Sequence, residues 1–146
     1  MMSEVVLTGA RLLNGVTAGI YIAFLVAFMS ALHGQPDEVY ARVMNRLNVV
    51  IVNPVFLAFF LGAPLLALVL LGWHRGPLSI TAACLAIAAV VITVAANLPL
   101  NDALANGGAV SSFERPWLIF HTLRTLAATG AFVLLSLPGV VTRMPG

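Results

Sequence analysis

Residues 77–100 read PLSITAACLAIAAVVITVAANLPL, an apolar run without Asp, Glu, Lys or Arg. A helix needs about 20 such residues to cross a bilayer. Residues 12–32 and 47–71 are equally free of these charged residues, and residues 116–137 contain only Arg124. The sequence therefore predicts four transmembrane spans at these positions and an all-α fold, an integral membrane four-helix bundle.

The bulk composition also favours a membrane protein without a soluble domain. Of 146 residues, 61% are hydrophobic and 8% are charged, whereas soluble domains carry about 25% charged residues. We therefore expect one transmembrane domain over residues 1–146. The first span is longer than the ~7 to 15 apolar residues of a signal peptide, so we expect it to be retained.

Four spans place both termini on one side of the membrane. The loops around residues 34–40 and 102–115 then lie together on the other side, which we call the loop side. The basic residues near the span ends are Arg11, Arg75 and Arg143 on the terminus side, and Arg42 and Arg115 on the loop side. By the positive-inside rule we expect a multi-pass cell-membrane protein with cytoplasmic termini. The net charge of +2 is not clustered, so we expect no nucleic-acid partner.

Prolines and capping residues predict where the helices bend and begin. The second helix is expected to continue over residues 36–71, with kinks at Pro54 and Pro64, because each proline removes an intrahelical hydrogen bond. The fourth helix is expected to begin with a capping box, in which Ser111 is the N-cap and Glu114 the third helical residue.

The fourth span carries ionisable groups inside the membrane, where such a group costs roughly 2.5 to 3.5 kcal/mol on insertion scales. Arg124 lies seven residues beyond Trp117, about 10 Å along the helix. At about 100° per residue, Glu114, Trp117, His121, Arg124 and Thr125 share one arc of the helix surface. These residues predict an inward-facing polar stripe.

Further polar residues gather in the loop-side half of the other spans. They are His33 in the first helix, Arg42, Asn45, Arg46, Asn48 and Asn53 in the second, and Asn97 and Asn101 in the third. The terminus-side half carries few polar residues. The asymmetry predicts a polar pocket inside the bundle that opens toward the loop side.

Several of these residues also have a purely structural interpretation. Buried asparagines such as Asn14, Asn48 and Asn53 can hold helices together, at ~0.6 to 2 kcal/mol each, without any ligand. Glu114 can serve only as a helix cap, and Trp117 only as an interfacial anchor.

A metal or haem site at His33 and His121 is an alternative, because histidine is the commonest metal ligand. The sequence contains no His-x-x-x-His, Cys-x-x-Cys or Glu-x-x-His element. We therefore expect no metal and no cofactor, with the two histidines as the alternative site.

Five sequence elements resemble the anthrone oxygenase-like family of small four-helix membrane proteins. They are Ala18-Gly19, Met44-Asn45-Arg46, Asn53-Pro54-Val55-Phe56, Asn97-Leu98-Pro99-Leu100-Asn101, and Trp117 with Leu123-Arg124-Thr125. The resemblance spans the whole chain. Where many members carry Asn before the Leu-Arg-Thr run, this chain has His121.

The resemblance implies that molecular oxygen oxidises an activated polycyclic phenol, anthrone to anthraquinone, without a bound cofactor. In that chemistry His121 is the expected base and Arg124 the partner of the oxyanion or phenolate, with Asn97 and Asn101 as orienting donors. The expected substrate-binding residues are Asn45, Arg46, Asn48, Asn53, Glu114 and Trp117.

Two other classes of function are consistent with the same residues. One is a non-catalytic subunit of a larger membrane complex that binds lipid or quinone, with Arg124 holding an anionic head group. The other is a redox protein with a metal or haem. In each case the expected partners are a hydrophobic small molecule or lipid and the membrane lipids. Gly15 and Gly19 offer one face for an oligomer.

Overall fold

A computed structural model describes residues 1–140 of the chain, and the regular structure in that part is entirely helical. The elements in chain order are α1 (Met2–Ala23), the π-helical turn η1 (Phe24–Phe28), α2 (Met29–Leu32), α3 (Asp37–Ile51), α4 (Pro54–Leu70), α5 (Pro77–Ile92), the π-helical turn η2 (Thr93–Asn97), α6 (Leu98–Ala105), α7 (Val110–Ser136) and the 3-10 turn η3 (Pro138–Val140).

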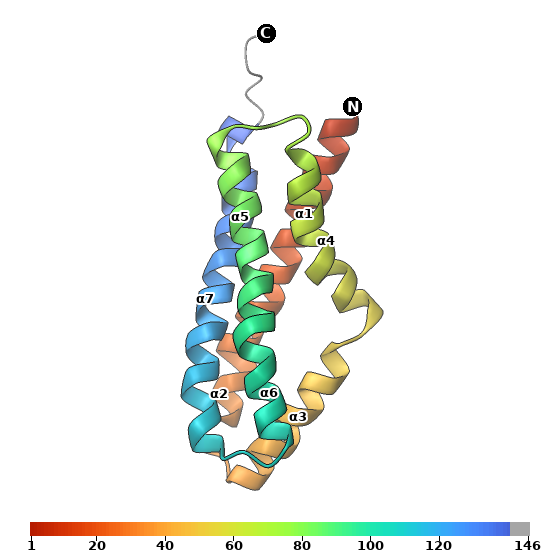
Figure 1. Ribbon diagram of the computed structural model, residues 1–146. Helices are drawn as coiled ribbons and strands as arrows, with labels where there is room; N and C mark the ends of the chain where they lie inside the picture. The colour runs from red at the N-terminus through yellow and green to blue at the C-terminus, as the bar shows by residue number, and fades with distance from the viewer. Residues whose placement is uncertain (141–146) are drawn as a thin grey trace.

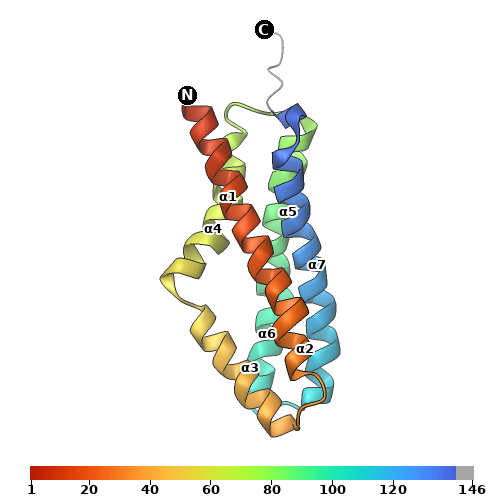
Figure 2. The same cartoon turned by 180° about the vertical axis from the view of Figure 1, so that it is seen from behind.

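These elements form four columns that lie side by side (Figures 1 and 2). Three columns run without a sharp bend over Met2–Leu32, Pro77–Ala105 and Val110–Ser136, and each is long and apolar enough to cross a membrane. The first two contain the π turns η1 and η2. The fourth column consists of α3 and α4, which meet at a 70° bend. The N-terminus and η3 lie at one end of the bundle. The all-α multi-pass membrane bundle is thus confirmed, and within residues 1–140 the first helix begins on the side where η3 lies.

The orientation of the bundle in the membrane stays a prediction. The orientation was predicted from the number of basic residues near the span ends on each side. One of these residues, Arg143, lies outside the described residues.

The second helix does not continue through residues 36–71, and that expectation was wrong. α3 ends at Ile51 and α4 begins at Pro54, so residues 52–53 form an unwound elbow (Figure 1). Pro54 has no N–H to donate to the preceding turn, which lets the helix separate there instead of bending gently. Pro64, by contrast, is accommodated inside α4.

Asn53 stabilises the elbow by serving both helix ends. Its Oδ1 accepts hydrogen bonds from the backbone N–H groups of Val55 and Phe56, at 3.1 and 3.0 Å. Its amide nitrogen lies 3.0 Å from the carbonyl of Val50 and 3.3 Å from that of Ile51, and donates to both. The side chain therefore replaces the backbone hydrogen bonds that the break removes.

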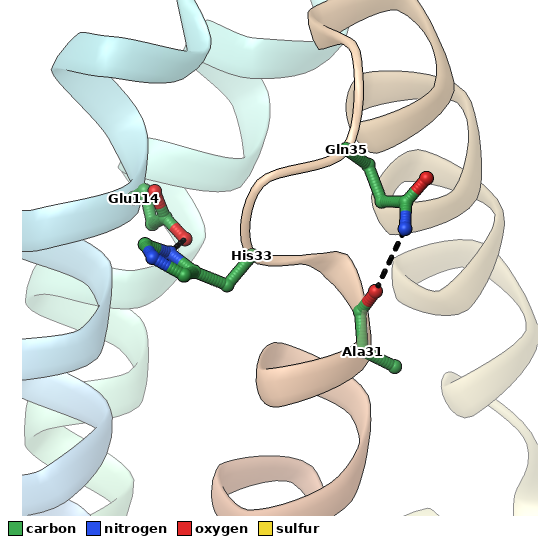
Figure 3. A network of polar contacts seen from close by, with 4 residues as sticks. All are labelled: Ala31, His33, Gln35 and Glu114. Carbon is green, nitrogen blue, oxygen red and sulfur yellow. Dashed lines mark hydrogen bonds and ion pairs between the residues drawn. The ribbon is translucent and has the colours of Figure 1, made fainter.

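The capping box expected at the start of the fourth helix is not formed. α7 begins two residues earlier than expected, at Val110, and its N-cap Ala109 provides no side-chain hydrogen bond. The Glu114 side chain instead contacts His33 on the neighbouring column, with His33 Nδ1 2.9 Å from Glu114 Oε1 (Figure 3). This tertiary contact replaces the local one.

The terminus-side half is held together by small residues and by buried polar side chains. A Cβ atom added to Gly62 would lie 2.7 Å from the Leu13 side chain, so α1 and α4 approach closely there. Asn14 donates to the carbonyl of Ala10 in its own helix, at 2.9 Å, and to that of Ala63 in α4, at 3.1 Å. Asn14 therefore links α1 to α4, in agreement with its purely structural interpretation.

Candidate functional site

Arg124 lies near the middle of α7 and is partly buried between three columns. Its Nε donates to His121 Nδ1 at 3.0 Å, and its Nη1 donates to Thr93 Oγ1, also at 3.0 Å. The guanidinium carbon lies 4.7 Å from the ring centre of Tyr21 and 5.5 Å from that of Trp117. Two neutral groups and two aromatic faces thus hold the cation in place. Within residues 1–140, no carboxylate forms an ion pair with it.

His121 is fully buried, and its two contacts determine its tautomer. Its Nε2 lies 2.8 Å from the backbone oxygen of Tyr21, which can only accept, so Nε2 carries the proton. Nδ1 then offers the lone pair that accepts the Nε–H of Arg124. The imidazole is therefore neutral, and both of its nitrogens are engaged in hydrogen bonds with protein groups.

The local helix geometry around these residues departs from the regular α-helix. Tyr21 precedes the π turn η1, and Thr93 opens the π turn η2. Such turns are uncommon and occur frequently at functional sites, because the extra residue changes which side chains face inward. The Thr93 hydroxyl donates to the carbonyl of Ala89 at 2.8 Å, which leaves its lone pairs for Arg124.

A cavity adjoins Arg124, with about 510 Å³ of empty space including its open mouth. Its polar lining comes from all four columns: Tyr21, Asn48, Thr93, Asn101 and Arg124. Its aromatic walls are Phe24, Phe56 and Trp117, and aliphatic side chains complete it. The cavity is mostly apolar, with few polar groups that face inward.

Two asparagines are among the residues that line this cavity. Asn101 Oδ1 accepts the indole N–H of Trp117 at 2.8 Å. The indole can only donate, so the other end of the Asn101 amide must be the NH₂ group. Asn48 lies on the elbow side, and its buried Nδ2 makes no hydrogen bond with any described residue.

Trp117 connects the cavity to the residues behind it. The indole is 1% exposed and stacks on His121, with ring centres 4.5 Å apart and planes inclined by 14°. Asn97, which is fully buried, donates to the backbone oxygen of Trp117 at 3.3 Å but does not line the cavity. Asn97 thus lies behind the site.

Besides Asn97 and His121, which lie behind the cavity, four further sequence-predicted residues lie away from it. Glu114 faces His33 at the loop end of the bundle, and the side chain of Asn53 is used in the elbow. Arg46 is exposed, and Asn45 is partly buried on α3, yet neither lines the cavity. The helical arc on which Glu114 was placed is broad, and only its deeper part turns toward the cavity.

The two histidines of the alternative metal site are not brought together. His33 lies with Glu114, whereas His121 is seven residues further along α7, about 10 Å deeper at 1.5 Å per residue. No group of three or more potential ligands among His, Cys, Asp and Glu occurs in the described part of the chain.

Tyr21 and Thr93 were missed by the sequence analysis. The Tyr21 hydroxyl is buried beside Thr93 and makes no hydrogen bond of good geometry within residues 1–140. Each residue is a single weakly polar side chain in an apolar span, which is common in membrane helices. Only their position relative to Arg124 distinguishes them.

Comparison with known proteins gives one match. The sequence profile described as anthrone oxygenase matches residues 37–134, which include α3 to α6 and most of α7. The matched region contains Asn48, Thr93, Asn101, Trp117 and Arg124, whereas the first helix with Tyr21 precedes it. No curated protein and no solved structure matches the chain.

Proposed function

The chain belongs to the anthrone oxygenase family, and from this premise we propose that it is a membrane-embedded oxygenase that uses molecular oxygen to oxidise an ionisable aromatic substrate of the anthrone type. The observation that carries the proposal is the uncompensated charge of Arg124 beside an aromatic cavity. The substrate is apolar enough to enter from the lipid and becomes anionic at the site.

Arg124 is suited to bind an anionic oxygen. Its two hydrogen-bond partners, neutral His121 and Thr93, satisfy N–H groups but do not neutralise the charge. Its remaining terminal nitrogen, Nη2, makes no hydrogen bond to a described residue, while the side chain lines the cavity. A cation inside a membrane is costly without a counter-charge. A phenolate or enolate oxygen at Nη2 supplies that charge.

The same interaction favours the reaction with oxygen. Loss of a proton from the ring methylene or its enol to water gives a delocalised anion, which Arg124 stabilises. The anionic carbon adds O₂ and the peroxide takes up a proton, giving a hydroperoxide. This hydroperoxide loses its C–H proton as the O–O bond breaks and water departs. The net change converts CH₂ and O₂ into C=O and H₂O.

In this proposal His121 positions Arg124 instead of serving as the base. Neither of its nitrogens has a lone pair directed to the cavity, because Nε2–H donates to Tyr21 and Nδ1 accepts from Arg124. An asparagine side chain also offers one donor and one acceptor. The imidazole therefore acts here as a rigid pair of hydrogen-bonding groups.

The decisive experiment compares oxygen uptake and quinone formation from an anthrone by purified wild type, Arg124→Gln and Arg124→Lys. Loss of one group that stabilises an oxyanion typically lowers kcat by about 10² to 10³-fold, and we expect Arg124→Gln to fall in this range. Lys keeps the charge without the planar fork, so an intermediate rate is expected. Arg11→Gln is the matched control, because Arg11 bonds to the carbonyl of Leu135 in the other half of the bundle.

Equal rates in wild type and Arg124→Gln would contradict the assignment of Arg124. A wild-type protein that binds the anthrone, or copurifies with an anionic lipid, but consumes no oxygen would instead indicate a non-catalytic lipid- or quinone-binding subunit.

A second pair of variants separates positioning by His121 from base catalysis. We expect His121→Asn to retain kcat within about tenfold, since the amide can replace both hydrogen bonds, while His121→Leu loses most of it. A general base contributes about 10² to 10⁴-fold, so a base role predicts that both variants fall equally. Recovery of activity in the Asn variant alone supports positioning.

A further inference from the structure

A groove follows the outer surface of α1 in the terminus-side half of the bundle. Five residues of α1 and one residue of α7 line it: Thr8, Arg11, Leu12, Gly15, Val16 and Phe132. The α1 residues recur at intervals of three and four, so they share one face of the helix. Among these lining residues Arg11 is the one charged side chain, Thr8 adds a hydroxyl, and the others are apolar.

The Arg11 side chain is fixed in this groove by one hydrogen bond. Its Nε donates to the backbone oxygen of Leu135 at 2.8 Å, and Leu135 lies in the last turn of α7. The two terminal nitrogens, Nη1 and Nη2, form no hydrogen bond or ion pair with a described residue. Glu4, the one acid on α1, lies seven residues earlier, about 10 Å along the helix. The guanidinium is therefore oriented, and its terminal N–H groups are left for an anion.

The depth of Arg11 in the membrane matches that of a lipid phosphate. The first apolar span begins at Leu12 and the fourth ends at Leu137, so Arg11 and Leu135 both lie at the terminus-side edge of the hydrocarbon. From this edge the groove continues along Gly15 and Val16 into the span. A cation at the edge followed by an apolar channel has the same order as the phosphate and acyl chain of a phospholipid.

Gly15 keeps the deeper part of the groove open. A Cβ atom added there would lie 3.0 Å from the ring of Phe132, which forms the facing wall. A larger side chain at residue 15 would therefore push against Phe132 or fill the groove. Gly19, one turn further along α1, has no neighbouring side chain within 4 Å of an added Cβ atom in residues 1–140, and it does not line the groove. Of these two glycines, only Gly15 affects the shape of the groove.

We propose that this groove is a binding site for an anionic phospholipid, with the phosphate at Arg11 and one acyl chain along Gly15 and Phe132. Arginine binds phosphate oxygens through its planar N–H groups, and basic pockets between membrane helices bind anionic lipid head groups. Arg11 has no counter-charge among residues 1–140, and an anionic lipid supplies one. None of the lining residues also lines the Arg124 cavity, so this site is independent of the proposed oxygenase function.

The test measures lipid binding to the full chain in detergent by native mass spectrometry. The probes are phosphatidylglycerol, which is anionic, and phosphatidylcholine, which is zwitterionic, with identical acyl chains and at equal concentration. We expect the first phosphatidylglycerol to bind about fivefold more tightly than the first phosphatidylcholine. This ratio corresponds to the ~1 kcal/mol that one basic residue contributes at an anionic membrane surface.

Variants of Arg11 assign that preference to the head-group end of the groove. Arg11→Gln is expected to reduce it to about twofold or less, while Arg11→Lys keeps the charge and retains most of the preference. Arg75→Gln is the matched control. Arg75 lies in the turn between α4 and α5 at the same end of the bundle (Figure 1), and its Nε also donates to a helix carbonyl, that of Leu71 at 3.0 Å. Arg75 does not line the groove, so its variant should keep the fivefold preference.

A second pair of variants tests the acyl-chain end. Gly15→Leu fills the groove, and we expect it to weaken the binding of both lipids about threefold, the equivalent of about five lost carbon–carbon contacts, with the preference intact. Gly19→Leu is the control, and it should bind both lipids as the wild type does.

Equal binding of the two lipids by the wild type would overturn the proposal. So would a preference that falls equally in Arg11→Gln and Arg75→Gln, because net charge would then explain it. A dimer that disappears in Gly15→Leu while lipid binding stays unchanged would assign the groove to a second copy of the chain, again contrary to the proposal. None of these measurements involves oxygen uptake, so failure of the oxygenase function would leave the lipid site standing.

Discussion

The terminus-side half of the bundle consists of regular helices packed through small side chains, whereas the loop-side half is interrupted in three of its four columns. In the first half, Ala10, Ala67, Ala82 and Ala131 are fully buried. In the second, η1, η2 and the elbow interrupt the helices. Regular helices can approach closely and leave no room, while interrupted helices separate and enclose a cavity.

The distribution of unsatisfied polar groups follows the same division. The buried side-chain atoms without a hydrogen bond in residues 1–140 are Tyr21 Oη, Tyr40 Oη, Asn45 Oδ1, Asn48 Nδ2, His74 Nε2, Ser79 Oγ and Asn97 Oδ1. Five of these seven belong to the loop-side half, on α1, α3 and η2. Unpaired buried polar atoms lower stability, and two of these five, Tyr21 Oη and Asn48 Nδ2, belong to residues that line the cavity. The terminus-side half supplies the stability that the site lacks.

The largest effect on stability is expected in the packed half. Ala131 on α7 is fully buried among Ala67, Ala83 and Ala86, so Ala131→Leu forces the helices apart. Overpacking of this kind typically costs about 1 to 3 kcal/mol, and we expect the free energy of unfolding in detergent to fall accordingly. Val133→Leu, at an exposed position two residues away, is the control. Unchanged stability of Ala131→Leu would mean that this half is not closely packed.

A smaller effect is expected at the elbow. Asn53→Ala removes the side chain that serves the ends of both α3 and α4. Loss of an N-cap costs about 0.5 to 2 kcal/mol, and we expect a decrease in unfolding free energy in that range. Hydrogen exchange of the Val55 and Phe56 amides should accelerate more than that of amides in α5. Uniform exchange across the protein would show that the elbow does not open locally.

The smallest effect is expected at the loop end of the bundle, where His33 and Glu114 pair in an exposed setting (Figure 3). The His33 side chain is 77% exposed, and exposed ion pairs contribute about 0 to 1 kcal/mol. Glu114→Gln keeps a hydrogen-bond acceptor, so the unfolding free energy should change by less than about 0.5 kcal/mol. A larger loss of unfolding free energy would show that this contact contributes substantially to the stability of the fold. That result would contradict the assignment of stability to the terminus-side half.

The sequence predicted the apolar columns well but not where their interiors are interrupted. Membrane spans follow from hydropathy because every backbone group in lipid must be paired within the helix. Pro54 indicated a bend, but the unwound elbow depends on whether neighbouring helices leave space for it. The π turn η1 contains no proline, whereas η2 is followed by Pro99, which has no N–H to donate to the carbonyl of Ala95.

The candidate site was predicted in part. The helical arc of α7 correctly brought Trp117, His121 and Arg124 to one region, because residues three and four apart share a helix face. The arc alone did not show that Glu114 turns to His33. The roles assigned to the individual residues stay predictions until the variants are measured.

By itself, the sequence determined that this chain spans a membrane several times as an all-α bundle, that its polar residues concentrate toward one side, and which family it resembles. These properties depend on composition and on short-range periodicity. Only the tertiary structure decided that Tyr21 and Thr93 join Arg124, that both nitrogens of His121 are occupied, and that Asn101 presents a donor. Hydrogen-bond direction depends on the partner, and the partners here lie on different helices.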